Sequence, residues 1–273
     1  MGRDTIVAIR DFESQIGRKL DVTRHYIRWG RDLLNRQVRL SAGGGRMPLI
    51  SLHPQKPSGV WIRWADVAAG RHDADLRLWA TAFRAWNRRA FFVYSHEPEN
   101  DPDAVTAAEF RAAYDHIRQI FDSVGTPKLR WTATFMRGTY AGAHGGIAQW
   151  VPKGCQLLGV DGYNRGECSG AGWVSFDWLF RPARDYAATL GKHLIIQEWG
   201  TVRRFACGAT GPESAASWIR NAGQTIKSWP EVKAVIYTNA AVQYAGRKIS
   251  FRVDNVPAAL RAYSEVGAGP YFS

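Results

Sequence analysis

Residues 106–135 read TAAEFRAAYDHIRQIFDSVGTPKLRWTATF and join a helix to a strand. Thr106 and Glu109 form a capping box, and apolar residues then recur at helical spacing until Gly125 ends the run. The short apolar run that follows is typical of a buried strand. A second such run, residues 90–95, precedes the helix, so this part of the chain predicts a strand-helix-strand unit of a parallel sheet.

The same alternation extends along the chain. Amphipathic helical patterns surround Trp79, follow Pro212 and follow Pro257. Seven apolar runs predict strands over residues 22–29, 49–52, 90–95, 129–135, 157–161, 194–197 and 234–238. We therefore predict an α/β fold of the (β/α)8 TIM barrel type, as a single catalytic domain over residues 1–273.

The predicted barrel lacks one strand. Residues 4–16 read as a helix closed by Gly17, which is the helix that would normally follow a first strand. Either the first strand is missing from this chain or the barrel closes irregularly.

Composition restricts the partners. The net charge of +12 favours encounters with nucleic acid, anionic membranes or acidic polysaccharides, but the basic residues are scattered and no nucleic-acid motif accompanies them. No apolar run is long enough to span a membrane, and the N-terminus has no signal-peptide core.

Twelve Trp fit a large aromatic core or a groove that stacks on sugars or nucleobases. We expect a monomer that binds neither nucleic acid nor membrane.

Two carboxylates directly follow apolar strands, in FFVYSHEPEND and HLIIQEWGT. The carboxyl ends of parallel strands are where catalytic groups gather, so Glu97 and Glu198 are the candidate catalytic residues. Glycoside cleavage requires two carboxylates in different environments, one acting as acid and one held ionised. The alternatives are that each Glu is a structural partner of an arginine, or that Glu99 replaces Glu97 as proton donor; we prefer Glu97 because Pro98 turns the chain before Glu99.

Other polar and aromatic residues stand at predicted strand ends. They are candidates for substrate binding, with a core or loop-fixing role as the alternative for His53: His53, His96, Tyr163, Asn164, Trp199 and Asn239. Trp61, Trp64 and Trp173 lie in loops on the same expected rim, where each either lines a groove or is buried under a loop.

The three cysteines, Cys155, Cys168 and Cys207, lack the spacing of a zinc site, so we expect no metal.

These motifs resemble glycoside hydrolase family 26, a family of β-mannanases and related β-glycanases in the clan of retaining (β/α)8 enzymes. The pair His96-Glu97 resembles its acid/base motif, and IIQEWG resembles the strand of its nucleophile, here Glu198. LLGVDGYN resembles the stretch whose tyrosine hydrogen-bonds the nucleophile, which implies that role for Tyr163. The similarity covers nearly the whole chain, and it implies an enzyme without metal or organic cofactor.

The resemblance agrees with the strand count. In that clan the acid/base follows strand four and the nucleophile follows strand seven, which is where Glu97 and Glu198 fall if the seven runs are strands two to eight. The chain departs from the family at strand eight, where Tyr237 or Asn239 stands in place of an expected Trp platform. Trp199 is the candidate substitute for stacking on a sugar.

We therefore expect a retaining endo-acting hydrolase that cleaves a β-linked polysaccharide, mannan-like or related, by double displacement. The alternative is a carbohydrate-binding protein on a glycosidase scaffold, such as a cell-wall or phage-tail component with little turnover. A nucleic-acid-binding protein would rest on charge alone. The resemblance implies an extracellular or cell-wall-directed protein, and a Cys168–Cys207 disulfide is an open expectation for an oxidising compartment.

Overall fold

The computed structural model describes residues 5–101, 106–166, 172–203, 214–244 and 246–272. These residues form two compact units. The first, named the β1–β4 unit, comprises residues 21–159 and 190–193, and the second, named the β6–β7 unit, comprises residues 1–20, 160–189 and 194–273. The division falls within strand β5 (Leu157–Asn164), so that each unit contains part of this strand.

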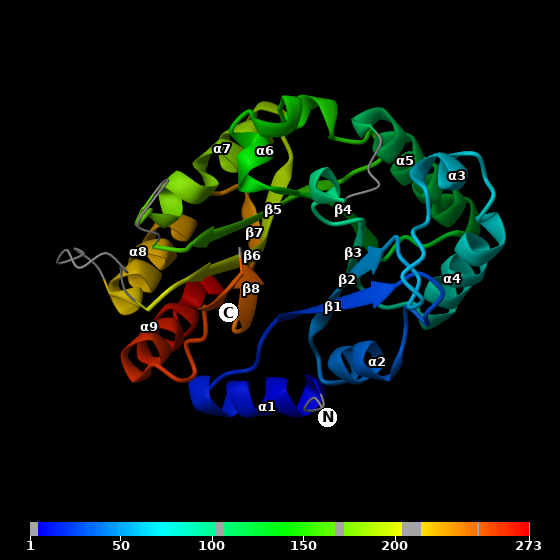
Figure 1. The fold of residues 1–273 in the computed structure, drawn as a ribbon. Coiled ribbons are helices and arrows are strands. Elements are labelled where there is room, and N and C mark those ends of the chain that lie inside the picture. The colour runs from blue at the N-terminus through cyan, green and yellow to red at the C-terminus, as the bar shows by residue number, and fades with distance from the viewer. Residues whose placement is uncertain (1–4, 102–105, 167–171, 204–213, 245, 273) are drawn as a thin grey trace. The chain divides into compact units, whose positions relative to one another are not determined.

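The β1–β4 unit is built on parallel strands that follow one another in chain order (Figure 1). Strand β1 pairs with β2 from Val22 opposite Met47, and β3 pairs with β4 from Ala90 opposite Leu129. Every residue of β3 is buried, as expected for a parallel strand covered on both faces. The strands are β1 (Val22–Arg28), β2 (Met47–His53), β3 (Ala90–Tyr94) and β4 (Leu129–Met136).

Helices cover these strands and close an aromatic core. The ring centroid of Trp131 lies 4.8 Å from that of Phe92 and 5.2 Å from that of Phe121, which joins β3 and β4 to helix α5. Helix α5 begins behind Thr106, whose Oγ1 accepts the N–H of Glu109 at 3.1 Å. The helices of this unit are α2 (Arg36–Gly43), α3 (Trp64–Ala68), α4 (Asp73–Trp86), α5 (Ala107–Val124) and α6 (Arg137–Tyr140), with 3₁₀ turns η1 (Pro98–Asn100), η2 (Ala143–Gly145) and η3 (Ile147–Gln149).

The β6–β7 unit continues the alternation of strands and helices. Its core is again aromatic, with Phe176 packed edge-on against Trp199 at 5.3 Å and close to Trp218 at 5.9 Å. Besides most of β5, the unit contains α1 (Thr5–Ile16), α7 (Phe176–Thr189), β6 (His193–Thr201), α8 (Ala215–Lys227), β7 (Val232–Tyr237), α9 (Pro257–Gly267) and η4 (Pro270–Phe272). Strand β6 pairs with β7 in parallel from Leu194 opposite Val232.

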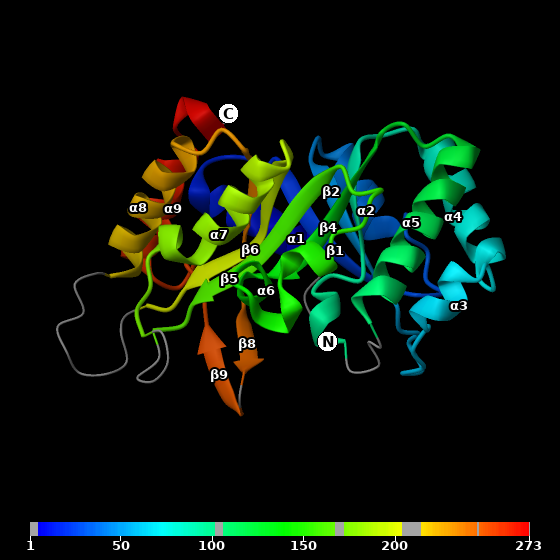
Figure 2. The same ribbon diagram turned by 90° about the horizontal axis from the view of Figure 1, so that it is seen from above.

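A two-stranded antiparallel hairpin lies outside the parallel sheet. Strands β8 (Ala241–Tyr244) and β9 (Arg247–Ser250) follow β7 directly, and Figure 2 shows the hairpin extending away from helices α8 and α9. The chain then returns through Phe251, which is buried, to α9. The sequence pattern did not predict this hairpin.

The seven predicted strands are confirmed, in chain order, with differences of a few residues at their ends. Among the residues that the structure describes, no strand precedes β1, and α1 ends at Gly17 with a φ of 71° as predicted. Helix α8 begins at Ala215 with Ser214 as its N-cap rather than at Pro212, which lies outside the described residues. No helix in the described part of the chain is both long and apolar enough to span a bilayer.

Candidate active site

Glu198 lies on β6 of the β6–β7 unit and is held by a tyrosine from β5. The hydroxyl of Tyr163 donates a hydrogen bond to Oε2 of Glu198 and also lies 3.1 Å from Oγ1 of Thr238, directly after β7. Three consecutive strands thus meet at one carboxylate. The hydrogen bond expected between Tyr163 and Glu198 is present.

The ring of Tyr163 is held by stacking, and burial keeps its hydroxyl protonated. Phe251 stacks on it with a centroid distance of 4.5 Å and an interplanar angle of 18°. Burial raises the pKa of Tyr163 far above its usual value, and the charges of Glu198 and Asp161 raise it further. The hydroxyl of Tyr163 therefore keeps its proton at neutral pH and donates it in the hydrogen bond to Glu198, and such a bond favours the ionised form of an accepting carboxylate.

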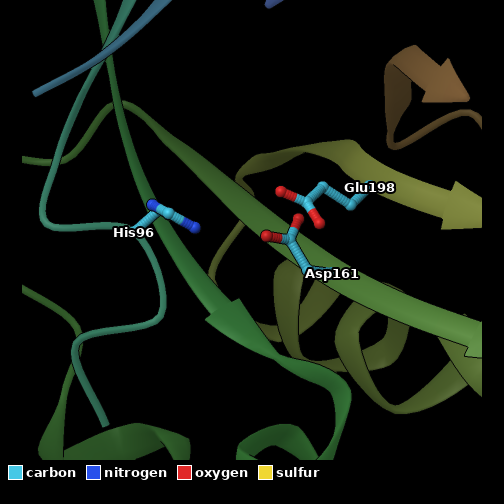
Figure 3. A group of neighbouring side chains, drawn as sticks. All are labelled: His96, Asp161 and Glu198. Carbon is cyan, nitrogen blue, oxygen red and sulfur yellow. The ribbon is translucent and has the colours of Figure 1, made fainter. Parts of the chain in front are cut away.

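Asp161 is a second carboxylate on the same strand as Tyr163. It is only 2% exposed, and one of its oxygens lies within 4.8 Å of a carboxylate oxygen of Glu198. Figure 3 shows how these two carboxylates lie. Asp161 was not among the predicted site residues, although its place near the end of a parallel strand is the signal that would have identified it. Because Tyr163 already occupies Oε2 of Glu198 with a proton, this oxygen is poorly suited to hold a cation.

Asn164, predicted to bind substrate, is buried and hydrogen-bonded within the protein. It is fully buried, its Nδ2 donates to Oγ1 of Thr201 at 2.8 Å, and its Oδ1 accepts the N–H of Val174 at 3.1 Å. These two bonds tie β5 to the end of β6 and to the chain that enters α7. Both amide atoms are thus already used within the protein.

Trp199 is also a core residue, which corrects its prediction as a sugar platform. It is 2% exposed and stacks on Trp218 at a centroid distance of 5.8 Å, with Tyr237 edge-on at 4.9 Å. Side chains alternate along a strand, so the residue after Glu198 points to the opposite face of β6, toward α8. No face of the indole is left for a ligand.

Asn239, predicted to bind substrate in place of the missing Trp, hydrogen-bonds the segment that follows the β8–β9 hairpin in the chain. Its Oδ1 accepts the N–H of Val253 at 2.9 Å, and its side chain also hydrogen-bonds the carboxylate of Asp254, whose pKa is lowered mainly by Arg252. Nearby, the hydroxyl of Tyr237 donates to the carbonyl of Phe251 at 2.9 Å. Tyr237 thereby holds Phe251, the residue on which Tyr163 stacks, and Asn239 holds the residues that follow Phe251.

Glu97 lies in a strained turn of the β1–β4 unit. Ser95 and Glu97 both have left-handed backbone conformations, with φ of 48° and 51°, which is uncommon for residues other than glycine and often occurs at functional sites. The turn is held by backbone bonds from Ser95 N to the carbonyl of Leu52 at 2.9 Å and from Glu97 N to the carbonyl of Thr134 at 3.0 Å. The carboxylate of Glu97 is half-buried and accepts from Nδ2 of Asn100 at 3.2 Å.

Glu99, the alternative proton donor, is a buried anchor. Its Oε1 accepts the N–H of Met136 and the hydroxyl of Thr139, both at 2.6 Å, which fixes the end of β4 and the start of α6. The side chain is 9% exposed, and burial raises its pKa to about 7 despite these donors. This position favours Glu97 over Glu99 as the group that reaches a substrate.

The two predicted histidines each pack against an aromatic ring. His96 packs edge-on against Tyr26 with a centroid distance of 5.3 Å, and His53 packs against Trp61 at 5.0 Å. Burial, with a smaller effect of the Arg28 charge, lowers the pKa of His53, so this ring is neutral at pH 7 and can both donate and accept a hydrogen bond.

The other predicted tryptophans and the cysteines differ in their burial. Trp64 is buried against Phe110 at 5.4 Å, whereas Trp61 and Trp173 are partly exposed. Cys155 is a buried free thiol whose pKa burial raises to about 11. Cys168 and Cys207 lie outside the described residues, so the disulfide stays a prediction.

Comparison with known proteins yields a sequence relative and many structural ones. Endoglucanase H from Acetivibrio thermocellus is 28% identical in an alignment that covers 96% of this chain and 29% of the relative. The chain thus spans less than a third of that protein. It matches no known protein-family profile.

The solved structures that resemble the chain include glycoside hydrolases of more than one family. A GH5-4 broad specificity endoglucanase from an uncultured bacterium superposes with a TM-score of 0.63 at 13% identity, covering 96% of this chain and 84% of that one. The catalytic domain of the GH26 endo-β-1,4-mannanase of Bacillus sp. JAMB-750 gives 0.60 at 16% identity, covering 95% and 79%. At such identities the likeness concerns the fold, and the fold of this chain is that of a (β/α)8-like barrel.

Proposed function

We propose that this chain is an endo-acting glycoside hydrolase that cleaves a β-linked polysaccharide with retention of configuration. The observation that carries the proposal is the Glu198 carboxylate on β6, which accepts a hydrogen bond from the buried hydroxyl of Tyr163. An ionised, oriented carboxylate at a strand end is what a glycosidase nucleophile requires. The similarity to an endoglucanase over 96% of the chain supports the same reading.

In the proposed reaction Glu198 attacks the anomeric carbon while the glycosidic C–O bond breaks. Glu97 gives its proton to the departing oxygen, and a covalent glycosyl ester forms on Glu198. Water then attacks the anomeric carbon and gives a proton to Glu97, and the ester bond to Glu198 breaks. No metal ion or organic cofactor takes part in these steps.

The turn around Glu97 supports its assignment as the acid/base. Left-handed backbone at Ser95 and Glu97 turns the chain sharply after β3, and bonds to Leu52 and Thr134 hold that turn against both neighbouring strands. His96 and His53 are proposed to contact the sugar beside it.

The proposed substrate is a β-glycan without a preference for mannan. The solved relatives include an endo-β-1,4-mannanase, β-1,4-endoglucanases and β-1,4-galactanases, so the fold accommodates several sugars. The resemblance to mannanases would place a Trp at the end of β7, where this chain has Tyr237 or Asn239. Tyr237 hydrogen-bonds the backbone of Phe251, and Asn239 hydrogen-bonds the backbone of Val253. A mannan-specific platform is therefore not part of the proposal.

The test is product release from a panel of β-glucans, mannans, galactans and xylans by wild type, Glu198→Gln and Glu97→Gln. We expect the wild type to shorten at least one polymer internally, with a rapid fall in viscosity, and each variant to lose at least about 1,000-fold in rate. Glu99→Gln is the matched control and should keep most of the activity. Binding without cleavage by the wild type would favour a carbohydrate-binding protein, and unaltered cleavage by Glu198→Gln would refute the catalytic assignment.

A further inference from the structure

An open pocket of about 480 Å³ lies at the carboxyl end of β1, entirely within the β1–β4 unit. Its volume is in the range of small-molecule sites. The residues that give it chemical character are Tyr26, Arg28, Arg31, Asp32 and Asn35. Two of these five are arginines, and both are exposed.

The two arginines are held at a fixed spacing by a tight turn. The N–H of Arg31 donates to the carbonyl of Arg28 at 3.2 Å, and Gly30 has a φ of 80°, as such turns require at this position. Trp29, inside the turn, is fully buried, and its indole N–H donates to Oδ2 of Asp75 at 2.9 Å. A buried anchor thus fixes the turn, and the two guanidinium groups project from it.

Neither Arg28 nor Arg31 forms an ion pair with any residue that the structure describes. Asp32 is the acidic group of the pocket, and its Oδ1 accepts the N–H of Leu34 at 2.8 Å. Oδ1 of Asn35 accepts the N–H groups of Gln37 and Val38, so the amino group is the part of this amide that can meet a ligand. The pocket therefore presents donors and an excess of positive charge.

An aromatic ring adjoins the arginines. Side chains alternate along a strand, so Arg24, Tyr26 and Arg28 share one face of β1. Tyr26 is 56% exposed, with the guanidinium of Arg24 4.6 Å from its ring centroid. The ring of Tyr26 also packs edge-on against the ring of His96, one residue before Glu97. The pocket is thereby next to the turn that carries the proposed acid/base.

We infer that this pocket is a subsite for a sugar that carries a carboxylate, and hence that the polysaccharide substrate is acidic. Guanidinium groups pair with carboxylates through two parallel hydrogen bonds, and a tyrosine ring beside them suits the apolar face of a pyranose. The net charge of +12 would draw such a polymer to the protein. The inference rests on the proposed function, because it names the substrate class of the same site.

The test compares two oligosaccharides that differ only in charge: cellohexaose, and the β-1,4-linked hexamer of glucuronic acid, in which each C6 hydroxymethyl is a carboxylate. Their affinities for Glu198→Gln protein are measured by calorimetry, so that no substrate is consumed. We expect the acidic hexamer to bind at least tenfold more tightly at 50 mM salt, and this preference to shrink at 500 mM salt.

Adding Arg28→Ala and Arg31→Ala should reduce the preference to about twofold or less and leave the affinity for cellohexaose unchanged. The matched control is Arg39→Ala with Arg89→Ala, which removes the same charge from two exposed positions outside the pocket and should keep the preference. Both double variants should keep the melting temperature of the parent.

Equal binding of the two hexamers, no binding of either, or the same loss of preference in both double variants would overturn the inference. The result is independent of turnover. If the wild type cuts no β-glycan but the arginine-dependent preference is found, then the proposed function fails and the acidic subsite stands. If the wild type cuts neutral glycans and the preference is absent, then the reverse holds.

Discussion

Replacing Tyr163 by Phe isolates the contact on which the proposed nucleophile depends. The substitution removes only the hydroxyl, which donates to Oε2 of Glu198, and keeps the ring that stacks on Phe251 at 4.5 Å. A hydrogen bond to a charged group contributes about 1.5–3 kcal/mol, so we expect kcat/KM to fall roughly 10- to 100-fold. Thr238 loses its partner at 3.1 Å at the same time.

The assay is the initial rate of reducing-end release from the best β-glycan of the panel, with thermal unfolding measured in parallel. Tyr140→Phe is the matched control, because Tyr140 is also buried and its hydroxyl donates to the carbonyl of Gly159 at 2.9 Å. It should lower the melting temperature while kcat/KM stays within about threefold. If Tyr163→Phe keeps more than half of the wild-type kcat/KM, then the hydroxyl does not hold a nucleophile.

Three further predictions concern Glu99, Asn164 and Trp199, which are buried. Because burial raises the pKa of Glu99 to about 7 from 4.5, the folded state favours its protonated form, and its contribution to stability is complete below pH 4.5 and lost as the pH rises to 7. Glu99→Gln should therefore unfold with a weaker pH dependence over this window, by up to about 3 kcal/mol in chemical denaturation, and an unchanged pH profile would contradict the buried position. Asn164→Ala removes two buried hydrogen bonds and should lower the free energy of unfolding by about 2–4 kcal/mol, while the KM of the folded protein stays the same. A raised KM at unchanged stability would instead support a role in substrate binding. Trp199→Ala should cost about 3–5 kcal/mol as a core truncation, and loss of sugar affinity in a variant that melts like wild type would refute this assignment.

The parallel fold could be predicted from the sequence because its signals are local. Apolar runs give the seven strands, and the capping box of Thr106 with the glycine at 125 gives both ends of α5. Helix α2 was missed because it is short and largely polar, and α7 because Pro182 interrupts its pattern. The hairpin over residues 241–250 was missed because its strands are short and mostly exposed.

The candidate site could be predicted only in part, because a place at a strand end gives the position of a residue but not the direction of its side chain. Glu198 and Trp199 are neighbours in sequence, yet alternation sends one to Tyr163 and the other into the core against Trp218. Asn164 and Asn239 were chosen as polar residues at strand ends, but their amides serve the backbone of distant segments, which no local pattern reveals. The single-domain assignment, the monomer and the site roles stay predictions.

Azide rescue on an activated aryl β-glycoside tests the central claim most directly. In a double displacement, azide replaces whichever carboxylate has been removed, and the anomer of the glycosyl azide reports which role that carboxylate had. We predict that Glu198→Ala regains activity with azide and forms the α-glycosyl azide, whereas Glu97→Ala forms the β-glycosyl azide. A β-glycosyl azide from Glu198→Ala, or rescue of neither variant alongside an active wild type, would contradict the assignment of Glu198 as nucleophile and Glu97 as acid/base.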